Sequence, residues 1–289
     1  MAYLENSPLA TFHYSYPSVQ ALASFIDVTP NRFATDEGKA PHRDGWAGTS
    51  SYQGALDLLN KGWPEGLAKM VTARAKAAPL AVMIPSYAYD VAGAYPNVAL
   101  ACAGEPMNMW APTEEERKTK PIVKVGINIS ASGSYDAQDF INYGAAILSY
   151  IDALESASNI RCEVWIMNYV KCNDGISTYL LEVKAKSPEE HLDLDRLAFM
   201  IANPAMLRRF VFCHKSRGPH YPASHLNSTY GRPIALPPRT DMLTLSGINT
   251  FAEPDDKILN SPHSIIAKLG PMLDAQLSAL GHTPPSIVW

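Results

Sequence analysis

One stretch of the chain combines positive charge with aromatic rings and contains no acid. Residues 208 to 239 hold five arginines and one lysine, and the next acidic residue is Asp241. Cations neutralise phosphates and exposed rings stack on unpaired bases, so this composition is typical of proteins that bind single-stranded nucleic acid. The sequence predicts phosphate contacts and stacking rings at Arg208, Arg209, Lys215, Arg217, Tyr221, Tyr230, Arg232 and Arg239. The alternative is an ordinary surface loop with scattered arginines.

A second candidate site is a serine-rich turn after a predicted buried strand. Five aliphatic residues between positions 122 and 129 form the short apolar run of such a strand. Its end carries polar side chains at Asn128, Ser130, Ser132 and Ser134. Open α/β sheets usually bind ligands at the carboxyl ends of their strands, so we expect a ligand turn here. Alternatively, the serines only turn the chain and cap the next helix.

The spacing Asn128-x-Ser130-x-Ser132 resembles the Asp-x-Ser-x-Ser signature of von Willebrand factor A domains. The resemblance implies a von Willebrand A-like fold over roughly residues 120 to 280. In that family, a carboxylate and two hydroxyls supply hard oxygen ligands for Mg²⁺. Here an amide replaces the carboxylate, and the strand expected at residues 209–214 ends in His214 and Lys215, where the family has an acid. We therefore expect no metal at this turn and no cofactor.

The surrounding segments alternate between strand and helix patterns. Apolar residues recur at helical spacing from Phe140 to Leu154, and short strands are predicted at residues 162–167, 179–184, 209–214 and 241–248. Further helices are expected to begin at Ser187 and at Ser261, each followed by proline. These elements predict a three-layer α/β/α fold with a mostly parallel, doubly wound sheet and an irregular N-terminal extension.

Changes in composition divide the chain near residue 113. Residues 1–112 are predicted to form an N-terminal arm, a helical hairpin and short strands at residues 80–84 and 98–102. The hairpin runs from Ser50 or Ser51 to Leu59 and from Glu65 to Ala78. A charged connector then leads into the von Willebrand A-like domain, residues 113–289.

Composition and the absence of known motifs exclude several classes of function. The net charge of −4 excludes a chain that is basic throughout, so any nucleic-acid surface must be local. Four cysteines without Cys-x-x-Cys spacing indicate free core thiols in a reducing compartment. Neither a signal peptide nor an 18-residue apolar stretch is present, which predicts a soluble intracellular protein without membrane contact. Phosphate-binding loops and nucleophile elbows are also absent, so no reaction is assigned.

Several segments are similar to a group of uncharacterised bacteriophage proteins, covering about two thirds of the chain. They are Asp90-Val-Ala-Gly, Ala103-Gly-Glu-Pro-Met, Asn128-Ile-Ser-Ala-Ser and Asn203-Pro-Ala-Met-Leu-Arg-Arg. This similarity implies a viral origin and no function; for a viral protein, the expected intracellular location is the host cytoplasm. Podoviruses that package a giant RNA polymerase encode a single-stranded-DNA-binding polymerase cofactor, and this chain's size and basic stretch are compatible with it.

Two hypotheses follow from the sequence. The first is a phage single-stranded-DNA-binding protein that acts in transcription or replication and recruits an RNA polymerase or replication protein. The alternative is a von Willebrand A-like protein-interaction module without enzymatic activity. The sequence leaves the oligomeric state open.

Overall fold

The computed structural model describes residues 2–3, 10–33, 36–41, 45–75, 87–93, 95–112, 120–156, 160–218, 230–251 and 257–284. Its large sheet has the strand order β1 (Ala2–Tyr3), β2 (Phe12–Tyr16), β8 (Thr178–Lys186), β7 (Arg161–Lys171), β6 (Ile122–Asn128) and β10 (Leu243–Leu245). A short strand, β9 (Arg232–Pro233), pairs with the end of β7. Three of the five pairings along this path are parallel. The predicted α/β class with a mostly parallel sheet is confirmed.

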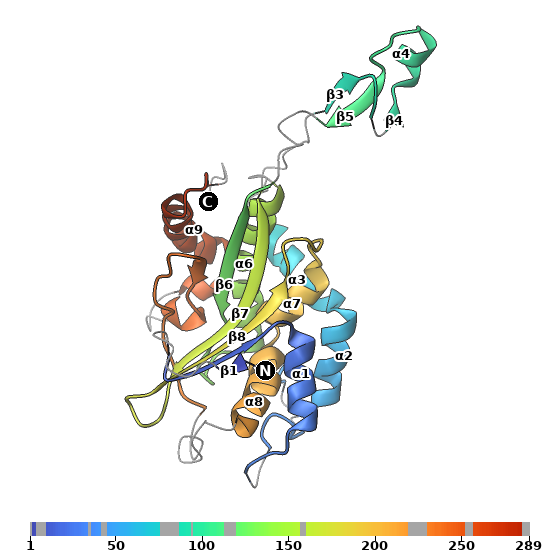
Figure 1. The fold of residues 1–289 in the computed structure, drawn as a ribbon. Helices are drawn as coiled ribbons and strands as arrows, with labels where there is room; N and C mark the ends of the chain where they lie inside the picture. Colours follow the sequence, from blue (N-terminus) through green and yellow to red (C-terminus); the bar gives the residue numbers. More distant parts are fainter. Residues whose placement is uncertain are drawn as a thin grey trace.

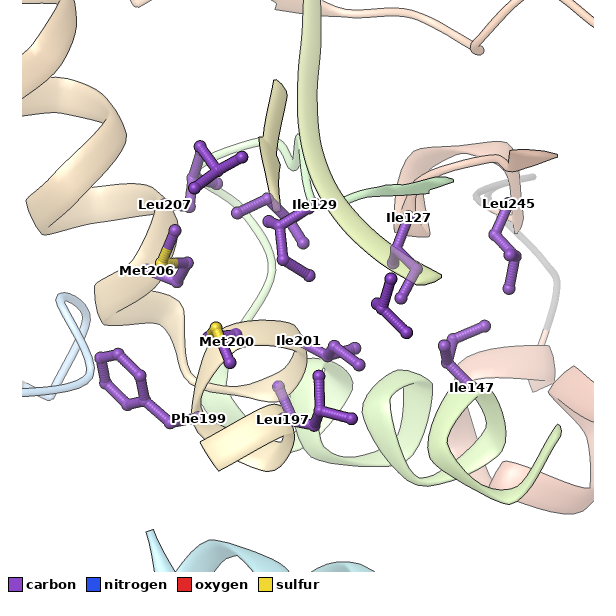
Figure 2. Packing of buried hydrophobic residues seen from close by; sticks show 14 of the residues in the cluster. Ile127, Ile129, Ile147, Leu197, Phe199, Met200, Ile201, Met206, Leu207 and Leu245 are labelled. Carbon is purple, nitrogen blue, oxygen red and sulfur yellow. The ribbon is translucent and has the colours of Figure 1, made fainter. Parts of the chain in front are cut away.

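Helices and one sheet face share the main hydrophobic core. The long helix α6 (Ala137–Ser156) contacts α3 (Pro64–Ala75), α7 (Leu194–Ala202) and α9 (Pro262–Ala279) (Figure 1). Figure 2 shows Ile127 and Leu245 above Ile147 of α6, with the α7 side chains beside them. Gly144 permits close packing of α6 on α7, because a Cβ atom there would collide with Ala202. The amphipathic pattern of residues 140–154 thus predicted the central helix correctly.

The N-terminal residues contribute to the same sheet. β2 lies between β1 and β8, and α1 (Val19–Val28) contacts β2 and β8. The predicted hairpin is present as α2 (Tyr52–Lys61) and α3, and the Ser51 hydroxyl caps α2 by accepting a hydrogen bond from the Gly54 N–H. Strands from both sides of the expected boundary at residue 113 therefore build one sheet.

An irregular segment covers part of the opposite sheet face. Leu236 and Met242 pack there on Met167 and Leu180, forming a smaller hydrophobic cluster. Gly126 leaves room for this contact, since a Cβ atom would lie 2.8 Å from the sulfur of Met242. The chain around and after β9 thus lies on this sheet face and brings residues 230–242 to the ends of the central strands.

A small unit formed by residues 87–93 and 95–112 lies beyond one end of the large sheet (Figure 1). It contains β3 (Tyr87–Asp90), β4 (Tyr95–Pro96), β5 (Met109–Pro112) and α4 (Val98–Cys102). The strand predicted at residues 98–102 is wrong, because these residues form α4. The Asn97 side chain caps that helix by accepting hydrogen bonds from two backbone N–H groups. The strand predicted at residues 80–84 lies outside the described residues.

The helix predicted from Ser187 begins later than expected. Residues 187–190 form a turn in which the Glu190 carboxylate accepts a 2.7 Å hydrogen bond from the Ser187 N–H. α7 starts at Leu194, after Asp193 has capped it. The helix predicted from Ser261 is confirmed as α9, and short 3₁₀ helices at Ile248–Phe251 and Lys257–Asn260 precede it.

Two further findings concern the cysteines and the length of the described helices. All four cysteines are free, but Cys102 is exposed, so the core-thiol interpretation is right for three of them. None of the described helices is long and apolar enough to cross a membrane.

Candidate ligand surface at the ends of the central strands

The basic stretch is folded differently from the prediction. Residues 206–217 form a π-helical turn, η1 (Met206–Val211), followed by α8 (Phe212–Arg217), so the strand predicted at residues 209–214 is wrong. Four predicted phosphate contacts belong to these helices and are buried, namely Arg208, Arg209, Lys215 and Arg217. Because their charged groups face the interior, they cannot contact a polyanion without unfolding this part of the chain. Their assignment as nucleic-acid contacts is therefore corrected.

The two adjacent arginines hold backbone carbonyls of the N-terminal loops. Arg209, which is 0% exposed, donates hydrogen bonds to Gly38 O at 3.1 Å, to Thr49 O at 2.6 Å and to Ala40 O. Arg208 donates to Trp46 O and to Tyr135 O, and its guanidinium lies 4.3 Å from the centroid of the Trp46 ring. Loop carbonyls that lose water on folding need donors, and a guanidinium offers five N–H groups in fixed directions. These arginines therefore act as structural links between η1 and residues 38–49.

Arg217 and Lys215 make comparable links. Arg217 forms an ion pair with Asp36 and donates a 3.0 Å hydrogen bond to Thr29 O. The Lys215 ammonium donates to Tyr230 O at 2.6 Å, and burial lowers the pKa of Lys215 to about 7. Beside it, burial lowers the pKa of His214 to about 3, and the imidazole is hydrogen-bonded to the hydroxyls of Tyr16 and Tyr179. A neutral imidazole can donate to one hydroxyl and accept from the other, which suits this buried position.

The Asn128 side chain makes three backbone hydrogen bonds at the predicted ligand turn. Its side-chain NH₂ donates a 2.9 Å hydrogen bond to Ile234 O, and its side-chain oxygen accepts from Ser130 N at 3.0 Å and from Tyr169 N at 3.2 Å. Asn128 is fully buried, and these bonds connect the end of β6 to β7 and to the chain that follows β9. An ionised aspartate accepts hydrogen bonds but donates none. The backbone acceptor Ile234 O needs a donor, which explains why an amide and not a carboxylate suits position 128.

The rest of the turn is held by contacts from three directions. Ser132 N donates to the Asn249 side chain at 3.0 Å, the Trp46 indole donates to Gly133 O at 3.2 Å, and Arg208 holds Tyr135 O. Ser130 is buried, and its hydroxyl has no hydrogen-bond partner among the described residues. Ser134 is exposed and donates to the hydroxyl of Ser132 at 3.1 Å. Of the four predicted turn residues, Asn128 and Ser130 face inward, whereas Ser132 and Ser134 lie toward the surface.

The remaining predicted contacts have different surroundings. Arg232 is exposed, while Arg239 forms ion pairs with Glu182 and Asp241. Tyr230 is half-buried and stacks on Phe212, with ring centroids 3.8 Å apart. Tyr221 lies outside the described residues. Arg232 is thus the predicted cation that keeps its charge at the surface.

The structure adds one residue that the sequence did not indicate. Lys171, the last residue of β7, is directly opposite Arg232 in the antiparallel β7–β9 pair, and both side chains are exposed. Strand pairing brings together residues that are 61 positions apart in the chain. A lone lysine before a turn gives no local signal of such a neighbour.

The described residues offer no grouping of three or more His, Cys, Asp or Glu side chains that could hold a metal ion. The expectation of a metal-free turn stays a prediction, and the three backbone contacts of the Asn128 amide support it.

Fold and site together define a mixed α/β protein whose central strands end in a fixed polar turn and an exposed pair of cations. The chain belongs to the family described as domain of unknown function (DUF7192), whose model matches residues 5–270. No curated protein and no solved structure matches the chain. The matched region includes residues on both sides of position 113, and the family description defines no activity.

Proposed function

We propose that this chain is a protein-interaction module with a von Willebrand A-like, three-layer core and a contact surface at residues 132–136. The observation that carries this proposal is the Asn128 amide, which fixes the turn through three backbone hydrogen bonds. Ligand-binding loops are effective when a rigid scaffold positions them, because less conformational entropy is lost on binding. A turn fixed by an amide needs no divalent cation, so binding should be independent of metal.

The β6–α6–β7 crossover supports the von Willebrand A-like part of this proposal. In the order of the chain, a central strand leads to the turn and to a long helix, and then to a strand parallel to the first. β8 follows as an antiparallel neighbour of β7. The resemblance noted at Asn128-x-Ser130-x-Ser132 falls at the corresponding place, directly after β6.

A site-specific photo-crosslinker at Ser134 tests the interaction proposal. In cells that produce the protein naturally, crosslinking from position 134 should yield one discrete protein adduct. The adduct should disappear when Asp136, which is exposed beside the turn, is changed to arginine. A crosslinker at exposed Gln53 on α2 is the matched control and should give no such adduct. Equal labelling from both positions, or an adduct abolished by EDTA, would contradict a metal-independent contact surface.

A second candidate function is favoured by the exposed cations at the end of β7. We propose that the protein acts as a phage single-stranded-DNA-binding protein in transcription or replication and recruits a polymerase in the host cytoplasm. Arg232 and Lys171 support this proposal because an acidic chain places two unscreened cations side by side there. Fluorescence anisotropy with single-stranded and duplex oligonucleotides across a salt series tests it. Binding that is absent at low salt, or equal for both forms, would refute a single-strand-specific role.

A further inference from the structure

The β7–β9 pairing places two like charges in direct opposition. Lys171 and Arg232 are register partners in an antiparallel ladder, so both side chains leave the sheet on the same face. The Cβ atoms of such partners are typically about 5 Å apart, and like charges at this position destabilise a pair of strands. A sheet selected for stability alone would have no reason to keep this arrangement.

Several contacts fix Arg232 opposite Lys171. Before it, Lys215 holds Tyr230 O at 2.6 Å, and the Tyr230 ring stacks on Phe212 with an interplanar angle of 3°. Gly231 has a φ of 93° and lies against β7, where a Cβ atom would be 2.8 Å from Val170 and 3.0 Å from Lys171 O.

The chain after Arg232 is held as well. Ile234 N donates to Tyr169 O at 3.4 Å, and Ile234 O accepts from the Asn128 amide at 2.9 Å. Contacts on both sides therefore fix the two-residue strand β9, so the fold determines the position of the Arg232 backbone opposite Lys171.

The charges of the pair are not compensated within the described part of the chain. Beyond the backbone pairing of the strands, the side chains of Lys171 and Arg232 form no ion pair and no hydrogen bond with a described residue. On its other side, Lys171 is opposite the neutral Thr178 of β8. Asp174, in the following hairpin, already accepts hydrogen bonds from the N–H groups of Ile176 and Ser177.

We propose that Lys171 and Arg232 form an anion site that takes a phosphate group. A guanidinium donates two parallel hydrogen bonds to phosphate, and an ammonium adds a compact point charge, so the two cations suit a ligand with several acceptor oxygens. Anion binding also removes the repulsion between the two side chains. The site is independent of the interaction-module proposal, and it rests on the single-stranded-DNA proposal only for the source of the phosphate.

Thermal denaturation with inorganic pyrophosphate tests the site itself. At low salt, pyrophosphate should raise the melting temperature of the wild-type protein, and the increase should be lost in Lys171→Ala and in Arg232→Ala. Lys69→Ala is the matched control, because Lys69 is an exposed lysine on α3, and it should respond as wild type does. Without pyrophosphate, both single variants should melt at the wild-type temperature or above it, because the like-charge repulsion is gone.

Anisotropy with a labelled thymidine oligonucleotide distinguishes the two sources of phosphate. If the ligand is single-stranded DNA, each variant should bind about tenfold more weakly than wild type, and the salt slope should flatten by roughly 0.7 per lost contact. Binding of pyrophosphate without binding of the oligonucleotide would support the site as one for free phosphate and would refute the DNA proposal. Variants that respond to pyrophosphate like wild type, or that melt at lower temperature without it, would overturn the site.

Discussion

Changing Asn128 to aspartate tests the structural role of the amide separately from the metal-binding role that the proposed resemblance to von Willebrand A domains implies for a carboxylate at this position. The substitution removes the donor to Ile234 O and places a carboxylate oxygen where the NH₂ group was, 2.9 Å from that carbonyl. A buried acceptor left without a partner costs about 1 to 3 kcal/mol. Asn128 is 0% exposed, so desolvation of the new charge adds to this cost. We expect Asn128→Asp to lower the free energy of unfolding by about 2 to 4 kcal/mol at neutral pH.

The pH dependence of this loss has a defined sign. Burial should raise the pKa of the introduced carboxyl group above its unfolded value of about 3.9. A protonated carboxyl can donate to Ile234 O, so the variant should be closest to wild type near pH 4 and should lose relative stability as the pH rises through the raised pKa. Urea denaturation followed by circular dichroism at pH 5 and pH 8 measures both effects. Asn260→Asp, at an exposed position, is the control for added charge.

The same variant creates the Asp-x-Ser-x-Ser spacing, so it also tests whether the turn can bind a metal ion. We expect Mg²⁺ to leave its unfolding midpoint unchanged, because Ser130 is buried and residue 128 is bonded to the backbone. A midpoint equal to that of wild type would refute the donor role of Asn128. A return to wild-type stability with Mg²⁺ would show that the turn can bind metal.

Three further substitutions or conditions test the core and the inward cations. Burial lowers the pKa of His214 to about 3 from its ordinary 6.5, so between these values the unfolded chain takes up a proton that the folded chain does not. As the pH falls from 6.5 towards 3, this group should therefore lower the free energy of unfolding by about 1.4 kcal/mol per pH unit. His214→Gln should remove that slope in pH-dependent urea titrations. Leu273→Ala should cost about 2 to 5 kcal/mol, since the side chain is 1% exposed in the core, whereas exposed Met272→Ala should leave the urea midpoint nearly unchanged. Arg217→Ala should cost about 3 kcal/mol, because Asp36 loses its ion pair and Thr29 O loses its side-chain donor. Thermal unfolding is the measurement, and a variant as stable as wild type would mean that the ion pair is dispensable.

Local sequence patterns predicted the elements around β6 well and the segment from Met206 to Arg217 poorly. The helix after the turn has apolar residues at helical spacing from Phe140 to Leu154 within its 20 residues, a signal long enough to exclude a strand. The run Phe210 to Cys213 is too short for that test, because brief apolar runs occur in buried strands and buried helices alike. In the helical segment formed by η1 and α8, residues on every side are buried, so no alternation of polar and apolar positions reveals a helical period in the sequence.

The orientation of the arginines depends on contacts far away in the sequence. Arg209 faces inward because it is bonded to carbonyls of residues 38, 40 and 49, more than 150 positions earlier in the chain. Composition shows that cations and rings are present in the stretch, but it does not show which of them reach solvent. Asn128 could be located from its spacing to the serines, whereas its bond to Ile234 O and the pairing of Lys171 with Arg232 required the tertiary fold.

The two candidate surfaces are mechanically connected through one side chain. The Asn128 amide holds the turn through Ser130 N and holds the strand that carries Arg232 through Ile234 O. A partner bound at residues 132–136 and an anion bound at Lys171 and Arg232 would therefore both contact segments that are hydrogen-bonded to Asn128. A metal ion at residue 128 would connect only the side chains that ligate it, whereas an amide joins backbone to backbone across three segments of chain. The Asn128 amide thus forms a rigid joint without an ion, and such a joint gives both candidate surfaces fixed positions relative to the sheet.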